Sequence, residues 1–68
     1  MSKKTIELVD SRWEYYTIEE YNGKYDVVKW ENGTWSDTNK GSIGETSNLA
    51  DALTLIRAYT GKEIKSIS

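Results

Sequence analysis

The side chains that most often carry out catalysis or bind metals are missing from this chain, which contains no cysteine and no histidine. Disulfides and thiolate metal sites are therefore excluded, and imidazole, the commonest general base and zinc ligand, is absent. Glu19 and Glu20 are adjacent, so on a strand their carboxylates would point to opposite faces and could not cooperate as an acid and a base. We therefore expect that the protein is not an enzyme and that it uses no cofactor and no metal.

Three short motifs resemble functional sites but do not have the required residues. In DTNKG, residues 37–41, the glycine comes one position too early for a calcium loop, and Asn48 stands where the bidentate glutamate belongs. GSIGETS, residues 41–47, lacks the Lys-Ser/Thr ending of a phosphate-binding loop. The triplet at residues 32–34 matches a glycosylation sequon, but nothing in the sequence indicates secretion. We interpret all three as turns or loops.

Size and composition predict one small domain. The 68 residues leave no room for a second domain, and three Trp and five Tyr supply much of the area that can be buried. The net charge of −2 argues against a nucleic-acid module that relies on electrostatics alone. No apolar run approaches the length of about 20 residues that spans a membrane, and the start MSKKTIELVD is not a secretory signal. We expect a cytoplasmic protein with no membrane partner.

Alternating, β-branched and aromatic segments separated by turn residues predict an antiparallel meander. Asn22-Gly23 and Asn32-Gly33 suit two-residue turns, in which both residues adopt positive φ. Residues 39–45 are interpreted as a glycine-containing loop, with room for a short extended piece at Ile43. The predicted strands are residues 5–9, 12–21, 24–31 and 34–38.

After this loop the spacing of apolar residues becomes helical. Asn48 suits the N-cap, and Gly61 suits the left-handed position after the last turn. We interpret residues 62–68 as a short strand, although Ile64 and Ile67 are three apart and do not share a face by simple alternation. The apolar helical positions are Leu49, Ala52, Leu53, Ile56 and Tyr59. The predicted fold class is α+β: an antiparallel meander sheet of four or five strands with one helix, about residues 48–60, packed on one face of a single domain, residues 1–68.

If both turns contain two residues, the strand register follows by counting from each turn. The predicted cross-strand pairs are Tyr21–Lys24, Thr17–Val28, Tyr15–Trp30 and Trp30–Trp35. One face then carries Trp13, Tyr15, Thr17, Val28, Trp30 and Trp35, and the other carries Tyr16, Ile18, Tyr25, Val27 and Lys29. A single helix covers one face only. Because the first face is larger and more continuous, we assign it to the core, which leaves the second face uncovered.

Two alternatives to this assignment stay open. Exposed Tyr and Val on a sheet surface often only support strand pairing, and the terminal strands could cover the second face. The assignment of the two faces could also be reversed, with the tryptophan face open.

The sequence RWEYYTIEEYNGKYDVVKWENGTWSDTNKGSI and the helix after it, residues 12–60, resemble the positive-cofactor-four-like family of single-stranded DNA-binding transcriptional coactivators. The matching motifs are Tyr25-Asp26-Val27, Asn32-Gly33 and Lys40-Gly41-Ser42-Ile43. The resemblance implies a homodimer that holds single strands across its sheets, with Lys29 and Lys40 as the matching cations. Val28 stands where the family usually has Arg, Gly44 interrupts the loop, and the 61–68 tail is additional.

The leading prediction is a small binding module that engages single-stranded nucleic acid through the uncovered face. Bases would stack on Tyr16 and Tyr25 above an apolar floor, and nearby cations would meet the phosphates. The predicted site residues are Arg12, Tyr16, Ile18, Tyr25, Val27, Lys29 and Lys40. The alternative is a protein-interaction module that uses the same face, either as a homodimer or as a phage-type inhibitor of a protein partner. The salt dependence of the affinity distinguishes a nucleic acid from a protein partner, because binding that is dominated by contacts to phosphates weakens steeply as the salt concentration rises.

Overall fold

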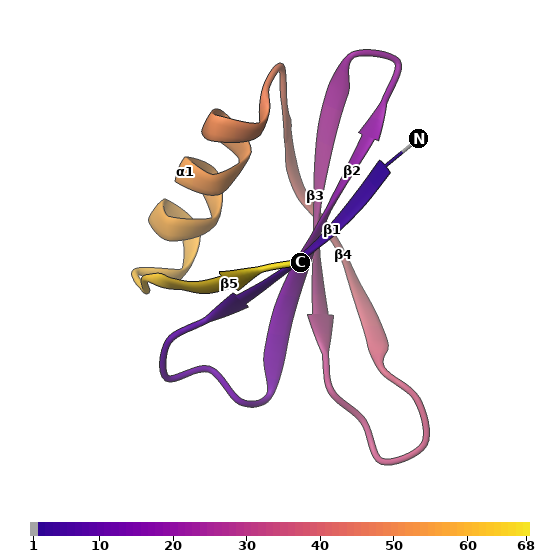
Figure 1. Ribbon diagram of the computed structural model, residues 1–68. Coiled ribbons are helices and arrows are strands. Elements are labelled where there is room, and N and C mark those ends of the chain that lie inside the picture. The colour runs from indigo at the N-terminus through magenta and orange to yellow at the C-terminus, as the bar shows by residue number, and fades with distance from the viewer. Residues whose placement is uncertain (1) are drawn as a thin grey trace.

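The computed structural model describes residues 2–68, so Met1 lies outside the described residues (Figure 1). One antiparallel sheet has the strand order β4-β3-β2-β1-β5, and a single helix packs on one of its faces. The elements are β1 (Ser2–Leu8), β2 (Glu14–Tyr21), β3 (Lys24–Glu31), β4 (Thr38–Thr46), α1 (Leu49–Thr60) and β5 (Ile64–Ile67). This arrangement confirms the predicted α+β fold class. Within residues 2–68, no helix is long and apolar enough to cross a membrane.

The hairpin of β2 and β3 forms as predicted. Asn22 and Gly23 have φ values of 50° and 75°, which is the combination that a two-residue type I′ turn requires. Tyr21 therefore pairs with Lys24, and counting back along both strands pairs Thr17 with Val28 and Tyr15 with Trp30.

The prediction for the next connection is wrong. Asn32 does not turn: its backbone N–H donates to the carbonyl of Trp13 at 2.7 Å, and its side-chain amide donates to the carbonyl of Arg12 at 2.6 Å. These bonds prolong the pairing of β2 and β3 by one residue, so the chain reverses later, within a loop of residues 32–37. Residues 34–37 of the predicted fourth strand belong to this loop. Gly33 is still required there, because a Cβ at this position would collide with the carbonyl of Ser36.

Strand β4 occupies most of the segment that we predicted as a loop. Glu31 pairs with Thr38, and Trp30 pairs with Asn39 instead of Trp35. Two register shifts interrupt the pairing of β3 and β4, between Val27 and Val28 and between Lys29 and Trp30. The glycines that suggested a loop serve these bulges and the approach of the helix.

Gly44 shows that approach directly. A Cβ at Gly44 would lie 2.8 Å from the Cδ2 atom of Leu55 in α1. The absence of a side chain therefore lets the helix pack closely against β4.

Strand β5 confirms the predicted strand in the tail, and its bulge explains the unusual isoleucine spacing. Ile67 pairs with Ile6, but after a register shift Ile64 pairs with Leu8. The extra residue in β5 brings both isoleucines to the same face, although they are three apart. Residues 64–67 thus complete the sheet beside β1.

The helix begins and ends at the predicted caps. The side chain of Asn48 accepts a hydrogen bond from the backbone N–H of Asp51 at 2.8 Å. Gly61 has a φ of 70°, and its N–H donates to the carbonyl of Arg57 at 2.8 Å. Between these caps, Ala52 and Ile56 are buried against the sheet.

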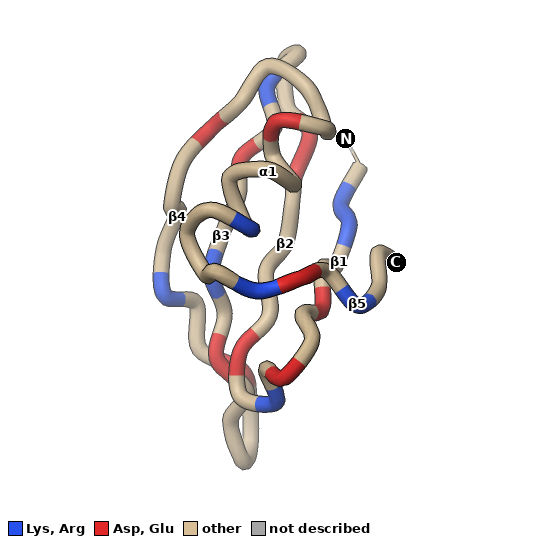
Figure 2. The backbone as a smooth tube through the Cα atoms, turned by 90° about the vertical axis from the view of Figure 1, so that its left-hand side faces the viewer, with Lys and Arg blue, Asp and Glu red and all other residues tan. Residues whose placement is uncertain are grey.

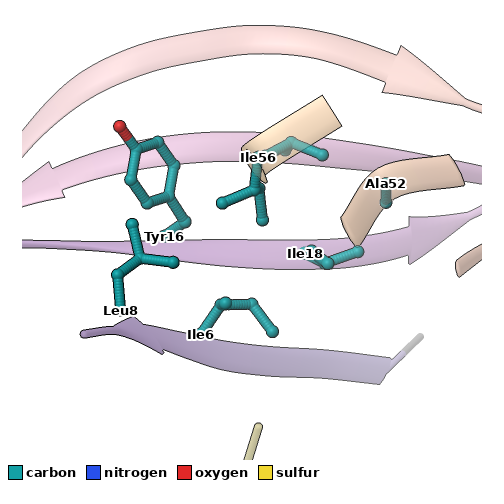
Figure 3. Close-up of a cluster of buried hydrophobic side chains, with 7 residues drawn as sticks. Ile6, Leu8, Tyr16, Ile18, Ala52 and Ile56 are labelled. Atoms are coloured by element: carbon teal, nitrogen blue, oxygen red, sulfur yellow. The ribbon is translucent and has the colours of Figure 1, made fainter. Parts of the chain in front are cut away.

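The helix covers the opposite face from the one that we predicted. The buried cluster consists of Ile6, Leu8, Tyr16, Ile18, Val27, Ala52 and Ile56 (Figure 3). The pairing of Ile6 with Tyr16 places the apolar positions of β1 on the same face as those of β2 and β3. That face is therefore apolar across three strands, whereas β1 presents Lys3, Thr5 and Glu7 on the tryptophan face. The tryptophan face remains open.

This assignment predicts which substitutions destabilise the fold. Ile56→Ala should lower the free energy of unfolding by about 2–5 kcal/mol, because it leaves a cavity between helix and sheet. Trp35→Ala should change it by no more than about 0.5 kcal/mol, because the Trp35 side chain lies in solvent. Urea denaturation measures both. If Ile56→Ala does not fold, Ile56→Val should cost about 0.5–1.5 kcal/mol. A larger loss for Trp35→Ala than for Ile56→Val would contradict the assignment of faces.

Candidate binding face

The centre of the predicted binding patch is buried. Tyr16 is only 1% exposed, and Ile18 and Val27 also lie beneath α1. The Tyr16 ring meets Tyr59 of the helix in a T-shaped contact with a centroid distance of 6.4 Å. The prediction that this face is open to a ligand is therefore wrong, because the helix that follows β4 packs over it.

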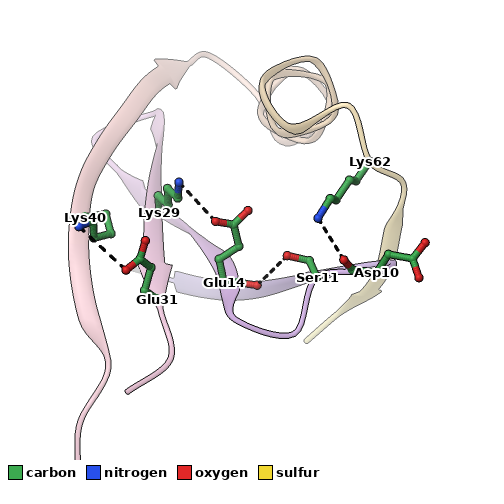
Figure 4. Close-up of polar contacts among 7 residues, drawn as sticks. All are labelled: Asp10, Ser11, Glu14, Lys29, Glu31, Lys40 and Lys62. Carbon is green, nitrogen blue, oxygen red and sulfur yellow. Dashed lines mark hydrogen bonds and ion pairs between the residues drawn. The ribbon is translucent and has the colours of Figure 1, made fainter. Parts of the chain in front are cut away.

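Of the remaining predicted site residues, two share the covered face of Tyr16 and two lie elsewhere. Tyr25 and Lys29 are partly buried on the helix-covered face, where the Lys29 ammonium pairs with the Glu14 carboxylate at 3.3 Å (Figure 4). Lys40 is exposed and lies 4.0 Å from a Glu31 oxygen. Arg12 is exposed in the connection between β1 and β2. Two of these three cations thus already face a carboxylate of this chain.

The open face of the sheet instead presents Trp13, Tyr15 and Trp30, and the loop of residues 32–37 at the same end of the sheet carries Trp35. We call these four residues the aromatic platform. Trp13 is 74% exposed, and Trp35, in the loop of residues 32–37, is 97% exposed. Tyr15 and Trp30 are neighbours on β2 and β3 and are partly buried. The tryptophans that the sequence suggested for the core therefore lie at the surface.

The two central rings of the platform have fixed positions. Tyr15 and Trp30 are stacked, with centroids 6.1 Å apart and an angle of 4° between the ring planes. The indole Nε1 of Trp30 donates to Thr17 Oγ1 at 3.0 Å. Thr17 is only 3% exposed although it lies on the open face. The Lys3 ammonium lies over the Trp30 ring, 5.6 Å from its centroid, within the range of a cation–π contact.

The loop that carries Trp35 is tied to the platform through Asp37. The Tyr15 hydroxyl donates to Asp37 Oδ2 at 2.6 Å, and the backbone N–H of Gly33 donates to Asp37 Oδ1 at 3.3 Å. The hydrogen bond to Asp37, followed by burial, raises the pKa of Tyr15 to about 12. Trp35 is therefore presented by a loop that is restrained at both ends, which lowers the entropy lost when a partner contacts it.

Three acidic residues lie directly opposite one another on the same face, and we call them the carboxylate row: Glu19, Asp26 and Glu45. Asp26 pairs with Glu19 on one side and with Glu45 on the other. Lys3 is opposite Glu19, and the Lys24 ammonium lies 3.6 Å from Glu45. Like charges in directly opposed positions destabilise a sheet. Among residues 2–68, no group of three or more acidic side chains is arranged to hold a metal ion.

Comparison with family models, with curated proteins and with solved structures finds no match to this chain. The resemblance to the positive-cofactor-four-like family therefore stays a prediction. Its Lys40–Ile43 motif lies within β4 and not in a loop.

A signal in the sequence could have identified the open face. The alternation of Ile6 and Leu8 shows that β1 has one apolar side, and this side must join the apolar side of β2 and β3. The predicted assignment of the faces depends on β2, β3 and a misplaced fourth strand only. The contact of Tyr15 with Asp37, by contrast, joins residues 22 positions apart through an irregular loop, and no local pattern predicts it.

The hydrogen bond between Tyr15 and Asp37 predicts a change in tyrosine titration. In the native chain Tyr15 should lose its proton near pH 12, and Asp37→Asn should lower this pKa toward the ordinary value of 10.0, because the carboxylate no longer opposes ionisation. Since the raised pKa belongs to the folded state, the native stability from this group should fall as the pH rises from about 10 to about 12. Ring signals in an NMR titration measure each tyrosine separately.

Tyr16 provides the internal control. Burial, followed by the charge of Glu14, raises the pKa of Tyr16 to about 12, and Asp37→Asn should leave that value unchanged. An unaltered Tyr15 titration in the variant would show that Asp37 does not hold the hydroxyl.

The carboxylate row predicts a stabilising substitution. Asp26→Asn keeps an oxygen that can accept the 2.6 Å hydrogen bond from the Ser42 hydroxyl, but it removes the charge between Glu19 and Glu45. We expect the free energy of unfolding to rise by about 0.2–1 kcal/mol, measured by urea denaturation at low salt. Glu63→Gln, an exposed acidic position outside the row, is the control and should have little effect. Destabilisation by Asp26→Asn would contradict repulsion within the row.

Proposed function

We propose that this protein is a non-catalytic binding module that contacts a protein partner through the aromatic platform. The observation that carries this proposal is the exposure of Trp13, just before β2, and of Trp35, in the loop after β3, at the end of the sheet where Tyr15 and Trp30 are stacked. Tryptophan and tyrosine are enriched among the residues that dominate protein-binding energies, since they bury a large area and lose little rotamer entropy. Exposed aromatics that are held by a hydrogen-bonded loop need little rearrangement before binding.

The charges of the open face favour a protein over a nucleic acid. The strands place three lysines on this face, Lys3, Lys24 and Lys65, against four carboxylates, Glu7, Glu19, Asp26 and Glu45. Proteins that hold single strands combine stacking rings with a positively charged groove that follows the phosphates. An acidic face opposes that contact.

Single-stranded nucleic acid is the second candidate, because the Trp30 ring is stacked and has a cation, Lys3, beside it. A base stacked on such a ring gains about 1–3 kcal/mol. This candidate would use the aromatic platform instead of Tyr16 and Tyr25, which the sequence suggested.

A capture experiment with matched variants tests the proposal. Immobilised wild-type protein, the double variant Trp13→Ala/Trp35→Ala and the control Tyr59→Ala are compared as baits. Tyr59 is an exposed aromatic residue on the helix, away from the open face. A partner of the platform should bind the wild type and the control but be lost from the double variant. With that partner purified, the double variant should weaken affinity by about 2 kcal/mol or more, roughly thirty-fold.

The same three immobilised proteins also show which results would contradict the proposal. Partners that bind all three baits equally would contradict a role for the platform. A short oligothymidine that shifts the Trp30 indole signal of isotope-labelled protein, with an effect that fades as salt is added, would support the second candidate instead. Sedimentation of the free chain reports whether the partner is a second copy.

A further inference from the structure

The charges around the aromatic platform indicate the chemistry of its partner. We infer that the partner presents a basic surface, in which lysine or arginine side chains border the apolar contact for the tryptophans. This inference rests on the proposed function, because it describes what occupies the same open face.

The carboxylate row and the aromatic platform are close enough for one partner to contact both. Glu19 and Tyr15 lie on the same side of β2, four residues apart, which is about 13 Å at the rise of a strand. Only a short polar and apolar strip, with Thr17 on β2 and Val28 on β3, lies between them. A standard interface covers about 800 Å² on each partner, so it extends across both features.

The row lacks enough cations of its own. Asp26 has a carboxylate on either side and a neutral donor, Ser42. The cation opposite Glu19 is Lys3, but its ammonium lies over the Trp30 ring. Glu45 has a single pairing with Lys24, in which both side chains are more than half exposed. Figure 2 shows these acidic positions near the same end of β2, β3 and β4.

Binding of a cation from a partner would therefore be favourable for two reasons. It would pair with a carboxylate, and it would relieve the repulsion between neighbouring members of the row. The contact of Lys3 with Trp30 is an internal example of a cation bound at the platform, and arginine makes such contacts more often than lysine does.

The same charges argue against two other occupants. In a two-fold dimer through this face, the same patch of each copy meets its equivalent, so the carboxylate row would approach another carboxylate row or extend the acidic surface. A nucleic acid would bring phosphates toward the row. Both arrangements add repulsion, whereas a basic protein surface removes it.

Two peptides of equal length test the inference on the full chain. One contains arginine and leucine in a glycine-serine background, and the other has glutamate in place of each arginine. Isotope-labelled protein is titrated with each at low salt. The basic peptide should shift the amide signals of Glu19, Asp26 and Glu45 and the indole signals of the platform, and these shifts should weaken with added salt. Stronger binding of the acidic peptide, equal binding of both, or no shift on this face at millimolar basic peptide would overturn the inference.

Charge variants supply the second readout. The triple variant Glu19→Gln/Asp26→Asn/Glu45→Gln should bind the basic peptide about ten-fold more weakly, since each exposed pair contributes modestly. Glu63→Gln, on the segment before β5, is the control and should bind as the wild type does. Unchanged affinity of the triple variant would also overturn the inference.

The two proposals fail in different ways. If the platform variants lose a captured partner while both peptides bind equally, the protein-binding function stands and the basic chemistry is wrong. If the platform variant captures every partner that the wild type captures, the proposed function itself is wrong, regardless of which peptide binds.

Discussion

The pairing of Ile6 with Tyr16 and of Ile18 with Val27 is the constraint on which the rest of the structure depends. It joins the apolar positions of three strands into one surface, and the single helix must cover that surface because its burial supplies much of the stability of so small a chain. Because side chains alternate along a strand, the residues between these apolar positions point to the opposite face. The exposure of the tryptophans is thus a consequence of where the aliphatic residues lie.

The uncovered face is organised in spite of its exposure. Trp30 shields the hydroxyl of Thr17 and accepts a cation over its ring, and Tyr15 is held by Asp37. These contacts fix the rings without burying them completely. Trp13 and Trp35 are mostly exposed and contribute little to the packing of the fold, which favours a role for them in binding.

Local signals in the sequence predicted the parts of the fold that depend on neighbouring residues. Asn22-Gly23 set the register of β2 and β3, and Asn48 and Gly61 set the ends of the helix. The same reasoning failed at Asn32-Gly33, because Asn32 bonds to the distant Arg12 and Trp13 and prolongs the strand pairing. The choice of the covered face failed for a different reason: it left out the apolar side of β1, where Ile6 and Leu8 join the apolar positions of β2 and β3. The predicted site was wrong for the same reason. The predicted pair of Tyr15 and Trp30 is confirmed, whereas Trp35 lies in a loop and does not pair with Trp30.

The two bulges of β4 have a consequence for the behaviour of the protein at high concentration. β4 is an outer strand of nine residues, and a regular outer strand of this length is a template on which other chains can add and grow into aggregates. The register shifts at Val27/Val28 and Lys29/Trp30 and the lysine within the strand interrupt that template. At the other side of the sheet, β5 has only four residues. The protein can therefore display tryptophans to solvent while its sheet edges resist polymerisation.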